Sequence, residues 1–349
     1  MTPATVNRVV AACRRQPLDR TPIWLMRQAG RFLPEYRALR ERWSLLELCG
    51  SAELAAEVTL QPVRRFGLDA AIIFADIMLP LIPMGVDLDF VEGEGPVVGS
   101  PLASAADVGR LRDIDIDTAL APTLEAIRSV RALADPAVAV IGFAGAPFTL
   151  ASYLIEGGAS RRFVRTKQFA WHEPAAYRAL MDRLAAVSAA FLEAQVRAGA
   201  DVVQLFDSWA GWLGPEDYAD LAAPWSARVL AAVRETGAPA IHFAVGAAGI
   251  LEPMRVAGGD VMGLDWRFRL TDGWSRVGFD RAVQGNLDPA VLLAPPAEIT
   301  RRARAILAHA AGRPGHIFNL GHGVHPETPL AAVHTLVDAV HAWDARNPG

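Results

Sequence analysis

Lysine is almost absent from this sequence. Lys and Arg together number 34 among 349 residues, and only Lys167 is a lysine. It lies in "RRFVRTKQFAWHEP", away from the end of any predicted strand. Enzymes that form a Schiff base with a carbonyl substrate, or with pyridoxal phosphate, need a lysine in the active site. The composition therefore argues against both chemistries.

Cysteine is also scarce. Cys13 and Cys49 are far apart and match no metal-binding or redox spacing, so we expect the protein to lie in the reducing cytoplasm. His322 and His325 are three residues apart in "FNLGHGVHP", but the glycine and proline around them disfavour a regular helix, and no neighbouring Cys or Glu completes a zinc set. We expect no metal ion and no organic cofactor.

Neither sign of charge is in large excess. Charged residues make up 21% of the sequence and the formal net charge is −4, with no basic block of the kind that binds nucleic acid. The opening "MTPATVNRVVAACRRQPLDR" lacks the apolar core of a signal peptide. The uncharged run 137–155 is nearly long enough to span a bilayer, but Gly142, Gly145 and Pro147 interrupt it. We expect a buried strand followed by a helix, and neither a nucleic-acid nor a membrane partner.

Short apolar runs that end in Gly, Pro, Asp or Ser recur along the chain, which is 52% hydrophobic. The runs are 22–26, 70–74, 138–144, 201–206, 239–244, 261–266, 281–284 and 316–320. Long helical patterns separate most of them, as at 179–198, 225–235 and 297–311. Alternating strands and helices predict a parallel sheet, and eight units without a compositional break predict one α/β domain over residues 1–349, a closed (β/α)8 TIM barrel. A doubly wound sheet is the alternative, but "RQAGRF" after the first run is not a dinucleotide-binding loop.

Unusual polar residues follow the predicted strands. Arg27 and Arg31 come after the first run, and Gly30 and Pro34 favour a tight turn and a helix start beside them. Two guanidiniums there are either ordinary surface charges or a site for carboxylate or phosphate groups. In a barrel, the loops after the strands open on one face, and that face carries the chemistry.

Four more residues fall in corresponding places, and each has an ordinary alternative. Asp76 follows the second run and is either a helix cap or a carboxylate that faces a ligand. Tyr153 follows the third run and is either a core aromatic or a ligand contact. Ser208 follows the fourth and is a helix cap or a ligand contact, without the motif of a nucleophilic serine. His322 follows the eighth and suits hydrogen bonding or proton transfer.

Two long motifs carry a family resemblance. "PIWLMRQAGRFLPEY" and "GFAGAPFTLASYLIEGG" resemble the two signatures of the uroporphyrinogen decarboxylase family, and "IIFADI", "LFDSWAG", "GLDWR" and "FNLGHGV" follow that family's pattern in the same order. The resemblance covers almost the whole chain. Phe32 stands where the family has tyrosine, and Val324 where isoleucine is usual.

The resemblance implies a (β/α)8 barrel, usually a homodimer, with a cleft at its mouth. It implies a cofactor-independent carboxy-lyase that removes CO2 from the acetate side chains of uroporphyrinogen III, giving coproporphyrinogen III in haem and porphyrin biosynthesis. The implied catalytic residues are Asp76, the central carboxylate, with Arg27, Tyr153 and His322, and the identity of the proton donor is left open. The implied substrate-binding residues are Arg27, Gln28, Ala29, Gly30, Arg31, Asp76, Tyr153, Phe206, Ser208 and His322.

Two other functions fit the same fold. A corrinoid- or thiol-dependent methyltransferase of the same superfamily would bind zinc through His and Cys near late strands, and neither cysteine lies there. A non-catalytic tetrapyrrole-binding protein would be expected to have lost residues such as Asp76, which is present.

Overall fold

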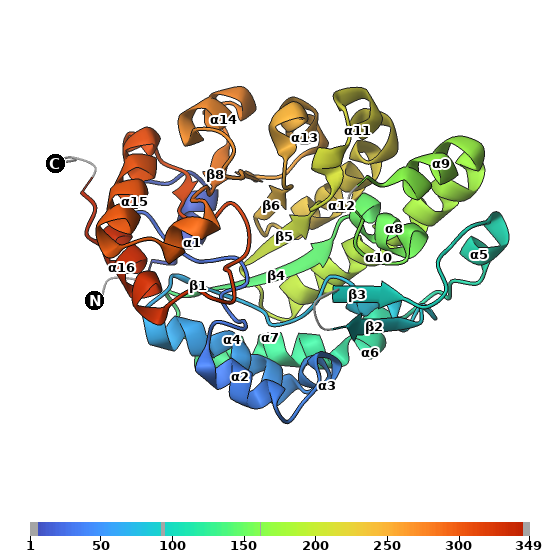
Figure 1. Cartoon of the computed structure of the whole chain (residues 1–349), viewed down its shortest axis with the longest axis horizontal. Helices are drawn as coiled ribbons and strands as arrows, with labels where there is room; N and C mark the ends of the chain where they lie inside the picture. The colour runs from blue at the N-terminus through green and yellow to red at the C-terminus, as the bar shows by residue number, and fades with distance from the viewer. Residues whose placement is uncertain (1–5, 92–94, 161, 345–349) are drawn as a thin grey trace.

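The computed structural model describes residues 6–91, 95–160 and 162–344. Its centre is a seven-stranded parallel sheet in the order β1-β4-β5-β6-β7-β8-β9, which helices surround (Figure 1). The strands are β1 (Ala70–Ile72), β4 (Ala139–Gly145), β5 (Val202–Phe206), β6 (Ala240–Phe243), β7 (Val261–Gly263), β8 (Ala282–Gln284) and β9 (His316–Ile317). They fall within or overlap seven of the eight predicted runs, so the barrel-like α/β fold is confirmed.

The run 22–26 was predicted as the first strand, and here the prediction was wrong in detail. Only Ile23 makes a parallel bridge, to Phe318 beside β9. On the other side the segment is held by a side-chain amide: Gln28 accepts from the Leu25 N–H at 3.0 Å and donates to the Ala70 carbonyl at 2.9 Å. A regular ladder is thus replaced by side-chain bonds together with a few backbone bonds, such as the Asp69 N–H to the Ile23 carbonyl at 2.9 Å, and these close the sheet between β9 and β1.

Helices connect consecutive strands of the main sheet, as the alternating pattern predicted, and further helices precede β1 and follow β9. They are α1 (Arg8–Cys13), α2 (Pro34–Arg40), α3 (Leu45–Gly50), α4 (Ala52–Phe66), α5 (Ala105–Gly109), α6 (Ile116–Ala119), α7 (Ala121–Leu133), α8 (Pro147–Glu156), α9 (Val164–His172), α10 (Pro174–Arg197), α11 (Pro215–Leu221), α12 (Ala223–Glu235), α13 (Leu251–Ala257), α14 (Leu270–Val277), α15 (Pro296–Ala310) and α16 (Leu330–His341). Short 3-10 turns are η1 (Leu79–Leu81), η2 (Ala210–Trp212), η3 (Ala247–Gly249) and η4 (Pro289–Leu293). The patterns at 179–198, 225–235 and 297–311 correspond to α10, α12 and α15.

The uncharged run 137–155 forms β4 and the first nine residues of α8, as predicted. Pro147 occupies the first turn of the helix, where its missing N–H costs nothing. The helix ends at Gly157, whose φ of 90° suits a residue without a Cβ. Among the residues that the structure describes, no helix is both long and apolar enough to cross a membrane.

An antiparallel hairpin, which the sequence did not predict, stands apart from the main sheet. It consists of β2 (Leu88–Val91) and β3 (Gly95–Val98), and β3 lies against α8 (Figure 1). The Val98 N–H donates to the Gly157 carbonyl at 2.9 Å. The hairpin thereby brings Pro96 to the edge of the cavity described below.

Aspartates begin three of the strands in the same way. Asp69, Asp201 and Asp260 directly precede β1, β5 and β7. Each carboxylate accepts the first free N–H of the preceding parallel segment: Ile23 at 2.9 Å, Val140 at 2.8 Å and Ala240 at 2.9 Å. A backbone donor at the open start of a strand would otherwise lack a partner. The pattern repeats every two strands and holds the amino-terminal end of the sheet together.

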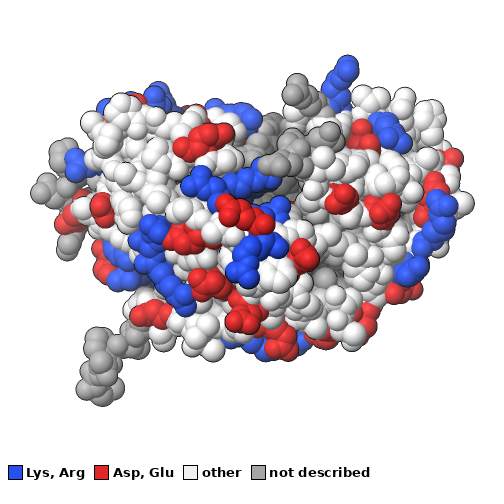
Figure 2. Space-filling view, turned by 60° about the horizontal axis from the view of Figure 1, so that its bottom comes forward, with Lys and Arg blue, Asp and Glu red and all other residues white. Residues whose placement is uncertain are grey.

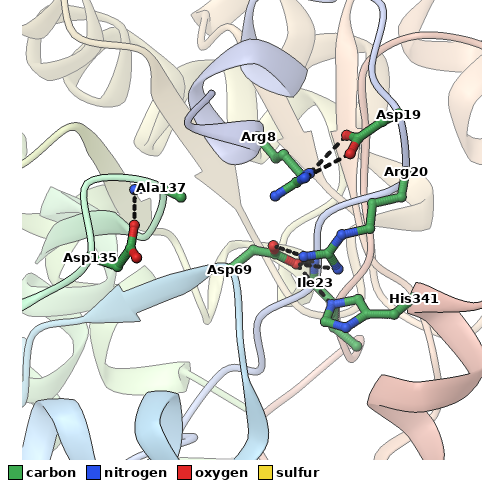
Figure 3. A network of polar contacts seen from close by, with 8 residues as sticks. All are labelled: Arg8, Asp19, Arg20, Ile23, Asp69, Asp135, Ala137 and His341. Carbon is green, nitrogen blue, oxygen red and sulfur yellow. Dashed lines mark hydrogen bonds and ion pairs between the residues drawn. The ribbon is translucent and has the colours of Figure 1, made fainter. Parts of the chain in front are cut away.

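The Asp69 carboxylate collects the most bonds of the three. Arg20 pairs with it at 2.7 Å, and His341 of α16 approaches it at 3.2 Å (Figure 3). Asp69 is almost wholly buried, whereas the nearby pair of Arg8 and Asp19 lies at the surface. On the face shown in Figure 2, positive and negative side chains are intermixed rather than segregated by sign.

Candidate active site

A cavity of about 390 Å³ opens at the carboxyl ends of the strands. Its lining comes from the loop after the first run, the ends of β1, β4, β5 and β6, strand β3, helix α8, the 3-10 turn η2 and the loop after β9. The lining residues are Met26, Arg27, Ala29, Ile72, Ile73, Phe74, Ala75, Asp76, Ile77, Pro96, Phe143, Tyr153, Phe206, Ser208, Trp209, Trp212, Phe243, Val245, His322 and Gly323. Residues as far apart in sequence as Met26 and Gly323 thus meet at one mouth, as the barrel prediction required.

Most of the predicted site residues line this cavity. Those that do are Arg27, Ala29, Asp76, Tyr153, Phe206, Ser208 and His322. Gln28, Gly30 and Arg31 are not part of the lining. The Gln28 side chain is fully buried and makes two bonds to backbone groups, which anchor its own loop.

Gly30 and Arg31 follow on the same loop. A Cβ on Gly30 would lie 2.9 Å from the Arg27 carbonyl oxygen, so a side chain there would force the turn open. Arg31 is exposed beside the cavity rather than inside it. It therefore faces solvent, where it can meet a part of a ligand that projects from the mouth.

Arg27 is held in an uncommon conformation. Its φ is 59°, in the left-handed region that residues with a Cβ seldom adopt. Gly323 leaves room for its side chain, since a Cβ on Gly323 would lie 2.5 Å from Arg27 Cδ. The Val324 N–H also donates to the Met26 carbonyl at 2.9 Å, which joins the two loops. Backbone strain held by such surroundings is typical of functional sites.

Asp76 lines the cavity at the end of β1 and is half-buried. Burial raises the pKa of its carboxyl group, whereas the bond from the Met78 N–H and the nearby Arg27 charge lower it. The Met78 N–H donates to Asp76 Oδ1 at 2.8 Å, just before η1. Asp76 does not cap a helix, because the N-cap residue of η1 is Met78 and no side chain caps it. The bond closes a local turn through one oxygen and leaves the other oxygen for a ligand contact.

Tyr153 projects from α8 toward the same space. Burial raises the pKa of its hydroxyl to about 12, with the Asp76 charge adding to the effect and Arg27 opposing it. The hydroxyl therefore stays protonated at neutral pH and can donate a hydrogen bond. Its ring packs on Trp209, with centroids 3.8 Å apart and planes inclined at 32°.

His322 is neutral in this setting. Burial lowers its pKa to about 4, and the positive charge of Arg27 acts in the same direction. The Gly323 N–H donates to His322 Nδ1 at 2.7 Å, which places the ring proton on Nε2. His322 is thus a hydrogen-bond donor at neutral pH, while the carboxylates of an anionic ligand would raise its pKa.

Ser208 and Phe206 flank the end of β5. Ser208 does not cap a helix: η2 begins at Ala210, its N-cap residue is Trp209, and no side chain caps it. Phe206 meets Phe143 and Phe243 edge to face, with centroids 5.5 and 5.9 Å apart. These three rings form an apolar wall, against which an aromatic ligand can lie.

Several lining residues were missed. Trp209, Trp212 and Phe243 contribute to the cavity without having been singled out from the sequence. Trp209 could have been predicted from the sequence, because it directly follows Ser208 in "LFDSWAG". Trp212 is 57% exposed at the mouth, and nothing in the spacing distinguished it from an ordinary surface tryptophan.

The part of the chain that the structure describes contains no group of three or more His, Cys, Asp or Glu side chains placed to hold a metal ion. Cys13 and Cys49 are both buried, and burial raises the pKa of each thiol. The site is instead an apolar cavity with one carboxylate, one guanidinium and neutral donors. Such a site suits an aromatic ligand that carries acidic groups.

Comparison with known proteins identifies the family. The family model described as Uroporphyrinogen decarboxylase (URO-D) matches residues 5–343. A uroporphyrinogen decarboxylase from Roseiflexus sp. (strain RS-1) is 54% identical over 98% of this chain and 99% of its own length. One from Sorangium cellulosum (strain So ce56) is 52% identical over 96% of both chains. The fold and site define a barrel enzyme of the decarboxylase class, and the chain belongs to the uroporphyrinogen decarboxylase family.

A solved structure supports the fold. A methyltransferase from Methanosarcina mazei superposes with a TM-score of 0.76 over 96% of this chain and 97% of its own, at 21% identity. At that identity the likeness shows the barrel architecture alone. The sequence relatives support the decarboxylase rather than the methyltransferase alternative.

Proposed function

We propose that this protein removes CO2 from the four acetate side chains of uroporphyrinogen III to give coproporphyrinogen III, a step of haem and porphyrin biosynthesis. The observation that carries the proposal is that the Asp76 carboxylate and the Arg27 guanidinium line one aromatic-walled cavity, where the Arg27 charge acts to lower the pKa of Asp76. The substrate has the matching chemistry: electron-rich pyrroles with N–H groups, ringed by carboxylates. The near-full-length relatives of this name agree.

The reaction needs no cofactor because the pyrrole serves as its own electron sink. A proton adds to the ring carbon that bears the acetate and leaves a cation on the ring. The bond to the carboxylate breaks, and its electron pair neutralises that cation as CO2 departs. The exocyclic carbon then takes up a proton to become a methyl group, and the ring carbon loses the one that it gained. The balance is one proton consumed for each CO2 released.

Asp76 provides the main stabilisation. A fixed anion beside a developing cation acts strongly in a cavity with little water, and it needs no reorganisation during the reaction. The uncatalysed reaction is very slow, so the enzyme has to lower the barrier by something on the order of 20 kcal/mol. Within this proposal, the other carboxylate oxygen of Asp76 accepts hydrogen bonds from the pyrrole N–H groups.

The other lining residues orient the substrate. Arg27 holds the reacting acetate, because a guanidinium is too weak an acid to be an efficient proton donor at neutral pH. Tyr153 and His322 both donate hydrogen bonds in their neutral forms. We assign the proton delivery to one of these two groups or to a water held by them, and we assign to Arg31 and Ser208 the binding of peripheral carboxylates.

We further propose that the protein is a single-domain, cytoplasmic homodimer. Two large apolar side chains, Trp171 of α9 and Trp212 of η2, are 60% and 57% exposed and are candidates for subunit contacts. Sedimentation equilibrium would test this, and a Trp171→Ser variant should weaken the dimer if α9 takes part. A monomer at micromolar concentration would contradict it.

The activity is tested by incubating the pure protein with uroporphyrinogen III under anaerobic, reducing conditions. The porphyrins are then oxidised and separated by chromatography. We expect hepta-, hexa-, penta- and tetracarboxylate products in sequence. A folded protein that leaves the octacarboxylate unchanged would contradict the proposed function.

A further inference from the structure

Asp207 lies between two lining residues but faces away from the cavity. Phe206 and Ser208 both line the cavity, whereas Asp207 is fully buried behind its wall. A carboxylate without exposure is costly unless the protein satisfies it. It therefore requires a structural or functional explanation.

The partners of Asp207 come from three other elements. Thr149 of α8 donates to Oδ1 at 3.3 Å, and Ser226 of α12 donates to Oδ2 at 3.1 Å. His242 of β6 lies with its Nε2 3.7 Å from Oδ2. Both hydroxyls and the imidazole are fully buried as well. Asp207 thus joins α8, α12 and β6 directly behind the site.

Thr149 links Asp207 to two residues that line the cavity, Trp209 and Tyr153. Its hydroxyl donates to Asp207 and also accepts a hydrogen bond from the backbone N–H of Trp209 at 3.3 Å. Thr149 and Tyr153 are four residues apart on α8 and so lie on the same helix face. The Trp209 ring packs on the Tyr153 ring, with the two centroids 3.8 Å apart. A chain of contacts therefore runs from Asp207 through Thr149 and Trp209 to Tyr153.

We infer that Asp207 and Thr149 are positioning residues for the proposed decarboxylation. Through these contacts they hold the backbone of Trp209, and so the place from which its ring packs on Tyr153. The ring in turn sets the tilt of Tyr153 and the placement of its hydroxyl in the cavity. The same bonds hold the backbone on either side of Ser208. The inference rests on the proposed function only for its kinetic consequence, because the ring geometry can be measured without substrate. A misplacement of about 1 Å in such a site can cost roughly 10²-fold in rate.

The test uses Thr149→Val, which keeps the side-chain shape and removes the hydroxyl. We expect kcat to fall by roughly 10-fold or more, with a smaller change in KM. Thr149→Ser, which restores a hydroxyl, should recover most of the rate. The matched control is Ser226→Ala: it removes another hydroxyl from the same carboxylate but makes no contact with Trp209. It should lower thermal stability while leaving kcat within about twofold.

Two further readouts separate positioning from a general loss of structure. In a Tyr153→Phe background, Thr149→Val should lower kcat by much less than it does in the wild type, because the residue that it positions has lost its hydroxyl. The near-UV circular dichroism band that Tyr153→Phe removes should also change in Thr149→Val and persist in Ser226→Ala. This spectroscopic result is independent of turnover, so it stands even if uroporphyrinogen is not the substrate.

Three results would overturn the inference. One is wild-type kcat and an unchanged dichroism band in Thr149→Val. Another is an equal loss of kcat in Ser226→Ala. The third is full additivity of Thr149→Val with Tyr153→Phe.

Discussion

At the scale of single residues, the two oxygens of Asp76 have separable roles. Oδ1 accepts the Met78 N–H, and an asparagine can keep that bond through its carbonyl oxygen. Asp76→Asn therefore removes the charge while retaining the local turn. We expect a folded protein whose kcat is lower by about 10²-fold, equivalent to about 2.7 kcal/mol of transition-state stabilisation. Steady-state kinetics with uroporphyrinogen, with circular dichroism to verify folding, measures this effect.

Asp76→Glu is the companion variant. It keeps the charge but moves it by about 1 Å, and it should also be damaging, because placement matters in a site of this kind. A folded Asp76→Asn protein with unchanged kcat would leave Asp76 with only the structural role of accepting the Met78 N–H.

The two arginines of the first loop should respond differently to truncation. Arg27 lines the cavity and Arg31 lies outside it. Arg27→Ala should lower kcat, while Arg31→Ala should mainly raise KM, because it removes binding common to the ground and transition states. Alanine at position 27 meets much the same backbone constraint at a φ of 59° as arginine does, so strain is little changed. Near-wild-type kinetics in both variants would show that the two arginines are ordinary surface charges that do not bind the substrate.

A buried histidine far from the cavity predicts how stability depends on pH. Burial lowers the pKa of His316 to about 4, and its Nε2 lies 2.9 Å from the Gly285 carbonyl oxygen. In the unfolded chain the pKa of histidine is near 6.5. Between these values the unfolded state binds a proton that the folded state does not, so the free energy of unfolding falls as pH falls from about 6.5 to 4. The contribution of His316 over that window is of the order of 3 kcal/mol.

Thermal unfolding of His316→Phe between pH 7 and 4 measures this contribution. The variant should lose less stability over that window than the wild type does, whatever its absolute stability. His172→Gln, at an exposed position of α9, serves as the control. If the stability of His316→Phe fell with pH as steeply as that of the wild type, another group would be responsible for the loss of stability at acidic pH.

At the scale of elements, the repeated strand-start aspartates have a measurable role. Asp69 accepts bonds from the Ile23 N–H, Arg20 and His341, so Asp69→Asn should lower the free energy of unfolding by about 3 kcal/mol. Asp19→Asn is a matched control in the same region (Figure 3), where an exposed pair with Arg8 should cost less than about 1 kcal/mol. Urea denaturation of both variants gives the comparison. Equal costs would show that burial of the Asp69 carboxylate does not matter.

The elements also show what the sequence could and could not predict. Runs such as 138–144 and 201–206 are strongly apolar and end sharply, and the structure places strands there. The run 22–26 reads the same way, yet its partners include the Gln28 and Asn319 side chains, and periodicity carries no information about side-chain pairing. The β2–β3 hairpin was missed because its strands are only partly buried and do not form a continuous apolar run.

The candidate site, too, could be predicted only in part from the sequence. Residues directly after strands, such as Asp76 and Ser208, could be predicted because strand ends converge in any parallel barrel. The orientation of the Gln28 side chain could not be predicted from its place in the loop, because it depends on the Ala70 carbonyl of β1. The aromatic wall was only partly predicted, since a phenylalanine that faces a cavity and one that faces the core have the same sequence pattern.

At the scale of the whole molecule, we expect activity without any metal ion or organic cofactor. Within the described ranges no acidic, histidine or cysteine cluster is suited to metal binding, and the single lysine pairs with Asp217 at 2.9 Å. Exhaustive dialysis against a chelator should leave turnover unchanged. Elemental analysis of the dialysed protein is the control. Loss of activity that zinc restores would contradict this expectation.

The closure of the sheet through Ile23 and Phe318 has a consequence for how the protein is made. Synthesis proceeds from the amino terminus, so the segment around Ile23 emerges first, while its β9-side partner emerges only after the other strands of the sheet. The sheet can grow in order from β1 to β8 as the chain lengthens, but it keeps two unpaired edges until Phe318 arrives. Open edges of this kind pair readily with other chains. We therefore expect a nascent chain stalled before β9 to be prone to aggregation, and the last strand to be translated removes that hazard by closing the sheet.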